Sequence, residues 1–78
     1  MGKLEKLIDI LLRDPPELSY DDVYYILTNF GFKEVSAKGS HHTFRNNQGL
    51  KITVPKKGGK TVKRTYLKQI ITLLKLGE

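Results

Sequence analysis

Apolar residues recur with helical spacing in three separate stretches of the chain. The first predicts a helix over residues 3–13, which must end at the Asp-Pro-Pro sequence of residues 14–16 because proline lacks an amide hydrogen. The second predicts a helix that starts after Ser19, whose hydroxyl can act as a cap, and stops before Gly31, which suits a left-handed cap. The third predicts a closing helix over about residues 63–77.

Between the second and third helices the apolar period changes to two, which is typical of β-strands. The alternation predicts strands over residues 32–38, 41–45 and 50–54, joined by turns at residues 39–40 and 46–49. The order is therefore helix, helix, three strands and helix, without a repeat or a linker long enough to divide it. Consecutive strands joined by hairpins predict an α+β domain, in which a three-stranded antiparallel sheet has helices on one face and solvent on the other.

The same alternation assigns side chains to the two faces of the predicted sheet. In the middle strand, apolar Phe44 must point toward the helices and His42 must follow it. We expect His42 to be partly buried and to hydrogen-bond a backbone carbonyl, and the preceding strand to alternate Val35 and Ala37 with polar residues. The residues expected on the open face are His41, Thr43, Arg45, Lys51 and Thr53.

Size and composition exclude several classes of protein. The chain has 78 residues and no cysteine, which suffices for one compact core and excludes disulfides and thiolate metal ligands. His41 and His42 are adjacent, so on a strand they point apart, which argues against a histidine metal site. No apolar run approaches the roughly 20 residues of a membrane span. The first residues mix charges with apolar side chains, unlike a signal peptide, so we expect a cytoplasmic protein without a membrane segment.

Charge divides the chain into two parts of opposite sign. The net charge is +6, yet residues 1–32 carry three basic and six acidic residues, whereas residues 33–78 carry eleven basic and two acidic residues. A second part this basic attracts polyanions, and nucleic acid is the commonest of them. The alternative is a charged surface that serves only solubility, although interspersed acidic residues would serve that purpose better.

Two features are suited to act on a bound nucleic acid. His41 is expected on the basic open face, where an imidazole can accept or donate a proton near neutral pH beside a phosphodiester. A lone surface histidine is more often a plain polar residue, so this alternative stays open. The Lys- and Gly-rich residues 56–60 predict a mobile loop before the last helix, whose free amides favour an anion, although the P-loop pattern is absent.

Three short sequences, in this order, resemble the HicA toxins: Gly-Phe at residues 31–32, Lys-Gly-Ser-His-His-Thr-Phe at residues 38–44 and Ile-Thr-Val-Pro at residues 52–55. The resemblance covers about residues 19–76 and implies an αβββα fold like the double-stranded RNA-binding domain. Residues 1–14 add an N-terminal helix, so the whole chain resembles a longer variant of one HicA-like domain. The family implies a ribosome-independent mRNA interferase of a toxin–antitoxin pair, inhibited by a HicB-like antitoxin.

The resemblance also implies that the histidine after Gly-Ser, here His41, is the catalytic residue of a ribonuclease that uses no metal or other cofactor. Neutral His41 would take the proton of a ribose 2′-hydroxyl, which then attacks the adjacent phosphate. Arg45, Lys51 or Lys60 would hold that phosphate as its charge develops. Two alternatives stay open: a noncatalytic module that binds duplex RNA by shape, and a small interaction protein whose charge is incidental. The residues expected to bind RNA are Lys38, Ser40, Thr43, Arg45, Lys51, Lys56, Lys57, Lys60, Lys63 and Arg64.

Overall fold

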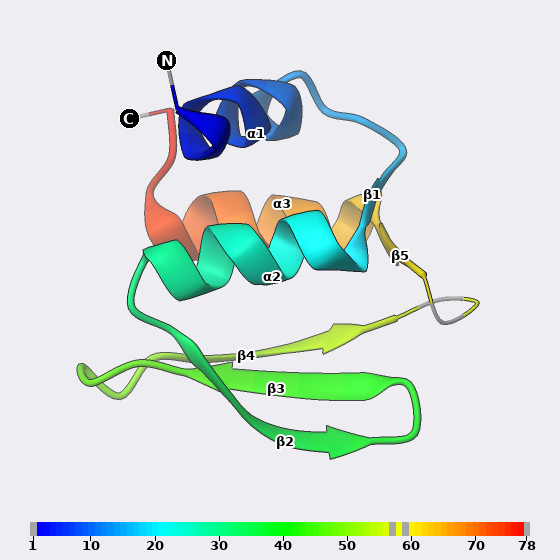
Figure 1. The fold of residues 1–78 in the computed structure, drawn as a ribbon, viewed down its shortest axis with the longest axis vertical. Helices are drawn as coiled ribbons and strands as arrows, with labels where there is room; N and C mark the ends of the chain where they lie inside the picture. Colours follow the sequence, from blue (N-terminus) through cyan, green and yellow to red (C-terminus); the bar gives the residue numbers. More distant parts are fainter. Residues whose placement is uncertain (1, 57, 59, 78) are drawn as a thin grey trace.

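Three helices and five strands are present in the computed structural model, which describes residues 2–56, 58 and 60–77. The helices are α1 (Lys3–Leu12), α2 (Tyr20–Asn29) and α3 (Arg64–Leu74). The strands are β1 (Glu17–Ser19), β2 (Lys33–Lys38), β3 (His41–Arg45), β4 (Lys51–Pro55) and β5 (Thr61–Lys63). Figure 1 shows that α2 and α3 lie between α1 and a sheet made of β2, β3 and β4. The predicted α+β class and the order of the main elements are therefore confirmed.

The capping residues of α2 explain where this helix begins and how the chain enters the sheet. The Ser19 hydroxyl accepts a hydrogen bond from the Asp22 amide at 3.1 Å, as expected for a helix cap. At the other end, Gly31 has a φ of +88° and the Phe32 amide donates to the Leu27 carbonyl at 3.0 Å. These contacts form a Schellman motif, which needs a left-handed residue and turns the chain into β2.

The sheet is antiparallel and has β3 as its middle strand. β3 pairs with β4 in unbroken register, with Phe44 opposite Ile52 and His42 opposite Val54. Phe44, Ile52 and Val54 are buried, so this face of the sheet meets the helices and the predicted facing of β3 is confirmed. The bounds of β3 are those predicted, whereas β4 lies one residue later than the predicted 50–54.

A β-bulge in β2 interrupts the predicted alternation of its side chains. Glu34 lies opposite Phe44, on the side of the sheet that faces the helices. Ser36 lies opposite Thr43 on the open side, so Val35 between them has no cross-strand partner and is 55% exposed. Strict alternation would have placed Glu34 on the open side together with Ser36. The bulge turns Glu34 toward the helices instead.

A second, two-stranded sheet joins the start of α2 to the start of α3, and the sequence analysis did not predict it. β1 and β5 pair antiparallel with Leu18 opposite Val62, and Val62 is fully buried. Next to this pairing, the Tyr20 amide donates to the Lys60 carbonyl at 2.8 Å. This contact fixes Lys60, the last residue of the predicted Lys- and Gly-rich loop, and β5 then leads directly into α3.

The hydrophobic core fills the space between the sheet and helices α2 and α3, and it continues between these two helices and α1. The largest fully buried side chains come from α1, α2, β3, β4, β5 and α3: Leu11, Val23, Ile26, Leu27, Phe44, Val54, Val62, Leu67 and Ile70. Leu11 belongs to α1, so the additional N-terminal helix is packed on the common core rather than merely attached to it. Within the described part of the chain, every helix is too short or too polar to cross a membrane.

Candidate functional site

The open face of the sheet carries three transverse rows of residues, because residues opposite one another in neighbouring strands share a face. A histidine row lies at one end, a hydroxyl row in the middle and a basic row at the other end. The histidine row is Lys38, His41 and Pro55; the hydroxyl row is Ser36, Thr43 and Thr53; the basic row is Lys33, Arg45 and Lys51. The five residues predicted for the open face all lie on it.

His41 is the first residue of β3, and its side chain is exposed. Its cross-strand neighbours are Lys38 in β2 and Pro55 in β4. Beyond Pro55, the Lys56 amide donates to the Ser40 carbonyl at 2.7 Å, which holds the start of β3 against the end of β4. His41 therefore stands at the end of the sheet, accessible to a ligand, next to the cation of Lys38.

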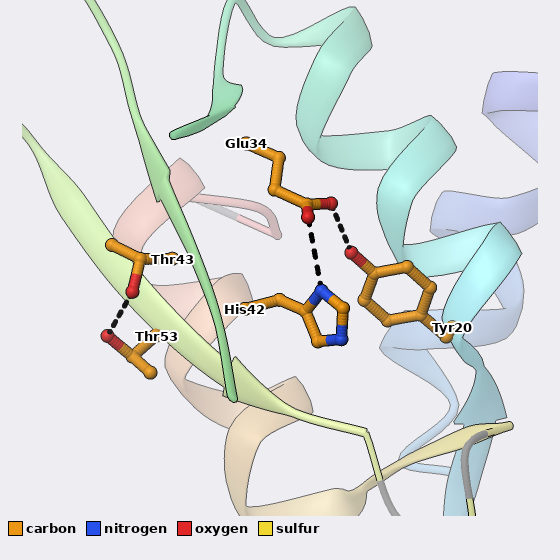
Figure 2. Close-up of polar contacts among 5 residues, drawn as sticks. All are labelled: Tyr20, Glu34, His42, Thr43 and Thr53. Atoms are coloured by element: carbon orange, nitrogen blue, oxygen red, sulfur yellow. Dashed lines mark hydrogen bonds and ion pairs between the residues drawn. The ribbon is translucent and has the colours of Figure 1, made fainter. Parts of the chain in front are cut away.

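The hydroxyl and basic rows complete this face. In the hydroxyl row, Thr43 Oγ1 and Thr53 Oγ1 lie 3.2 Å apart, within hydrogen-bonding distance (Figure 2). The side chains of the basic row are exposed, and in the described part of the chain they form no ion pair. Lys33 was not among the predicted site residues. Its place follows from its pairing with Arg45, which alternation within a single strand does not reveal.

The described carboxylates lie elsewhere than on this face. Glu34 points to the helix-facing side of β2, and the other acidic residues that the structure describes lie in α1, α2, β1 or the segment between α1 and β1. The bulge at Val35 is the reason that Glu34 is turned away from the open face. A face with cations and without carboxylates has a positive potential, which attracts phosphate groups.

On the opposite side of β3, His42 belongs to a hydrogen-bonded network with Glu34 and Tyr20 (Figure 2). His42 Nδ1 lies 3.2 Å from Glu34 Oε2, and the Tyr20 hydroxyl donates to Glu34 Oε1 at 2.6 Å. The Tyr20 and His42 rings lie against each other, with their centroids 4.6 Å apart. His42 is partly buried as predicted, but the predicted backbone carbonyl is wrong: its partner is a carboxylate. The bulge brings that carboxylate to this side of the sheet.

Within this network the Tyr20 hydroxyl stays protonated and the Glu34 carboxyl stays ionised. The hydrogen bond from Tyr20 holds the pKa of Glu34 below its usual value, although partial burial opposes this effect. His42 and Lys56 lower the pKa of Glu34 further. Burial, followed by the bond to Glu34, raises the pKa of the Tyr20 hydroxyl well above its usual range. Tyr20 thus remains a donor and Glu34 an acceptor, and the network supports the strand that presents His41.

Of the basic segment predicted at residues 56–60, the two described cations, Lys56 and Lys60, lie beside the N-terminal end of α2. The Lys56 ammonium lies 4.5 Å from the centroid of the Tyr20 ring, which is a cation–π contact on the helix-facing side of the molecule. A hollow of about 380 Å³ is lined here by Ser19, Tyr20, Asp21, Lys56 and Lys60. Lys57, also predicted to bind RNA, lies outside the described residues, and the mobility of the segment stays a prediction.

Lys63 and Arg64, also predicted to bind RNA, belong to the β1–β5 sheet and the start of α3 rather than to the open face. Lys63 Nζ is 4.0 Å from Glu17 Oε2, and Arg64 Nε is 3.4 Å from Asp14 Oδ1. The pairing of β1 with β5 brings these early acidic residues to the late basic ones. The structure therefore separates the predicted residues into an open-face group around His41, the cations beside the start of α2, and the pair that carboxylates partly neutralise.

Comparison with known proteins gives one match. A family model described as the HicA toxin of bacterial toxin–antitoxin systems matches residues 20–76. The searches of curated proteins and of solved structures returned no match. The matched part runs from α2 into the end of the chain after α3 and leaves α1 outside, as expected for a variant with an additional N-terminal helix. Since the match covers most of the chain, this protein belongs to the HicA toxin family of bacterial toxin–antitoxin systems.

Proposed function

We propose that this protein is a ribonuclease, the toxin of its pair, and that it cleaves RNA with His41. The observation that carries the proposal is an exposed imidazole at the end of a cationic sheet face. RNA contains its own nucleophile, the ribose 2′-hydroxyl. A group that moves protons and a cation that holds the phosphate therefore suffice for cleavage, and the reaction needs no metal ion or other cofactor.

The proposed reaction starts when His41 accepts the proton of the 2′-hydroxyl, whose oxygen then attacks the adjacent phosphorus. The bond from phosphorus to the 5′-oxygen breaks, and that oxygen takes a proton from solvent, to which this face is open. The products end in a 2′,3′-cyclic phosphate and a 5′-hydroxyl. Lys38, the neighbour of His41 across β2 and β3, stabilises the negative charge that develops on the phosphate.

The test is incubation of the purified protein with labelled RNA, with and without EDTA, followed by analysis of the product ends. Cleavage that EDTA does not affect, with cyclic phosphate and 5′-hydroxyl ends, is the expected result. Binding without cleavage would instead make the protein a noncatalytic RNA-binding module. Products with a 5′-phosphate would contradict attack by the 2′-hydroxyl.

The partner in this proposal is a HicB-like antitoxin with an acidic surface that covers the open face. A surface of this charge binds polyanions broadly, so the cell that makes the toxin in its cytoplasm must keep the surface covered. We expect a neighbouring reading frame to encode such a protein, to copurify with this chain and to suppress its toxicity. Expression that is harmless without any neighbouring acidic protein would contradict the toxin assignment.

Neutralising the basic segment should weaken RNA binding. Lys56→Gln combined with Lys60→Gln removes two cations beside the hollow at the start of α2. Each phosphate that is no longer neutralised should lower the slope of log affinity against log salt by about 0.7 for single-stranded RNA. Titrations of a labelled, uncleavable RNA at several salt concentrations measure this slope. A slope equal to that of the parent would show that Lys56 and Lys60 do not contact RNA phosphates.

A further inference from the structure

The basic row lies far along the strands from the phosphate that His41 would act on. Arg45 follows His41 by four residues in β3, which corresponds to about 13 Å along the strand. Side chains stand roughly perpendicular to a sheet, so most of this separation persists at their ends. This distance argues against the role that the sequence analysis predicted for Arg45 and Lys51, which was to hold the phosphate at His41, and any phosphate that the basic row binds would be a different one.

The spacing between the rows matches the repeat of a nucleic acid strand. Successive rows are two residues apart along β3, or about 6.7 Å. One nucleotide adds as many backbone bonds to its strand as two amino-acid residues add to theirs, so an extended RNA strand and a β-strand advance by similar distances. An extended RNA strand that runs along β3 with one phosphate at the histidine row would therefore have the next phosphate at the hydroxyl row and the following one at the basic row.

We propose that the basic row, Lys33, Arg45 and Lys51, forms a second phosphate-binding site that takes the phosphate two nucleotides from the cleaved bond. This inference rests on the proposed function, and it specifies the substrate as single-stranded RNA that lies along β3. Three strands span about 10 Å, which matches one sugar–phosphate backbone. Duplex recognition instead requires contacts across successive grooves.

Three observations support a ligand at this row. Its cations are exposed and, among the described residues, without ion pairs, so their charge is available. The β-bulge removes the one described carboxylate that strict alternation would have placed on this face, Glu34. Apart from the imidazole of His41, the rows contain hydroxyl groups and cations but no aromatic side chain on which a base could stack. The face therefore recognises the RNA backbone and tolerates different base sequences.

The test uses short DNA strands that contain a single ribonucleotide, so that only one bond can be cleaved. One phosphate at a time is replaced by a neutral methylphosphonate. We expect replacement of the phosphate two nucleotides from the cleaved bond, on one side of it, to raise KM roughly fivefold, because an exposed charge contact contributes modestly to binding. The value of kcat should stay unchanged, because this contact is equally strong in the ground state and in the transition state. Arg45→Gln combined with Lys51→Gln should raise KM by a similar factor. In this variant the same methylphosphonate should have a much smaller further effect, because both changes weaken one contact, to which only Lys33 still contributes.

A matched control removes the same charge from another surface. Lys6→Gln combined with Lys68→Gln changes exposed residues of α1 and α3 and should leave KM within twofold of the parent at the same salt concentration. If the control raises KM as much as the basic-row variant does, the effect reflects net charge and the second site is wrong. If the basic-row variant keeps the parental KM but loses binding of the antitoxin, the row serves the protein partner and the second site is also wrong.

The outcomes separate this inference from the proposed function. Normal KM in the basic-row variant, together with lost cleavage in His41→Ala, overturns the second site and leaves the ribonuclease. If the parent cleaves no RNA, the ribonuclease fails and the row is tested by binding of a 2′-O-methyl RNA strand. A salt slope that falls by about 0.7 for each phosphate that the basic-row variant no longer neutralises then supports the site. An unchanged slope overturns it.

Discussion

His41→Ala should abolish RNA cleavage, with a loss of about 10²–10⁴-fold in kcat, the range that a general base contributes. The substitution should leave the fold intact, because the His41 side chain is exposed and contributes nothing to the core. RNA binding should persist, since the cations of the open face remain. The expected variant is therefore a folded protein that binds RNA but neither cleaves it nor arrests growth. Measurement of single-turnover cleavage, thermal unfolding and RNA affinity on the same preparation checks all three parts.

His42→Ala is the matched control for this prediction. His42 lies next to His41 in sequence but on the other face of β3, within the Tyr20–Glu34–His42 network. Its loss should appear in the free energy of unfolding, as a decrease of about 1–2 kcal/mol, while cleavage at a temperature where the variant is folded stays close to that of the parent. If His42→Ala loses cleavage and His41→Ala keeps it, the reactive imidazole is on the helix-facing side. Normal cleavage by both variants would contradict any histidine mechanism.

The pH dependence of cleavage gives a second readout of the same mechanism. A general base must be neutral to accept the proton of the 2′-hydroxyl, so acid that protonates His41 should decrease cleavage by the parent. The residual activity of His41→Ala should lack this decrease. EDTA should change neither profile. A parental profile without an acidic limb would show that no imidazole accepts the proton.

The elements that were predicted well are those whose sequence pattern lies within the element itself and extends over many residues. α1, α2 and α3 each repeat their apolar positions over two or more turns, and Ser19 and Gly31 act through contacts within a few residues. β3 has one buried face that includes Phe44, so its alternation assigns both faces. Alternation within this one strand is enough to place His41 on the open face.

The features that escaped the sequence analysis depend on partners that are distant in the chain. β1 and β5 are each only three residues long, which is too short for a period to show, and they exist because they pair with each other. The bulge at Val35 is defined only by the register of β2 against β3. Glu34 was therefore not assigned to the helix-facing side, so its hydrogen bonds to Tyr20 and His42 were missed as well. The pairing of Lys63 and Arg64 with early acidic residues has the same origin.

Glu34→Ala should lower the free energy of unfolding by about 2 kcal/mol, because it leaves the Tyr20 hydroxyl and His42 Nδ1 without their common partner. Tyr20→Phe removes one of these bonds and should cost about 1 kcal/mol. The double variant should cost less than the sum of the two single variants, since both changes break the same bond. Denaturant unfolding with an unchanged m-value measures each difference. Glu17→Ala, which removes an exposed carboxylate 4.0 Å from Lys63, is the control and should cost less than about 0.5 kcal/mol.

The pH dependence of this stabilisation distinguishes a charged network from ordinary packing. The bond from Tyr20 holds the pKa of Glu34 in the folded protein below its usual value of 4.5. The stabilisation from Glu34 is therefore present in full above that usual value and is lost as the pH falls through the lower pKa of the folded state. The difference in unfolding free energy between the parent and Glu34→Ala should be constant near neutral pH and should shrink below about pH 4.5. Glu34→Gln keeps the shape and one hydrogen bond to Tyr20 but cannot ionise. The difference in unfolding free energy between Glu34→Gln and Glu34→Ala should therefore not change through this pH range. A difference between parent and Glu34→Ala that stays the same down to the acid transition would mean that Glu34 acts through its packing alone.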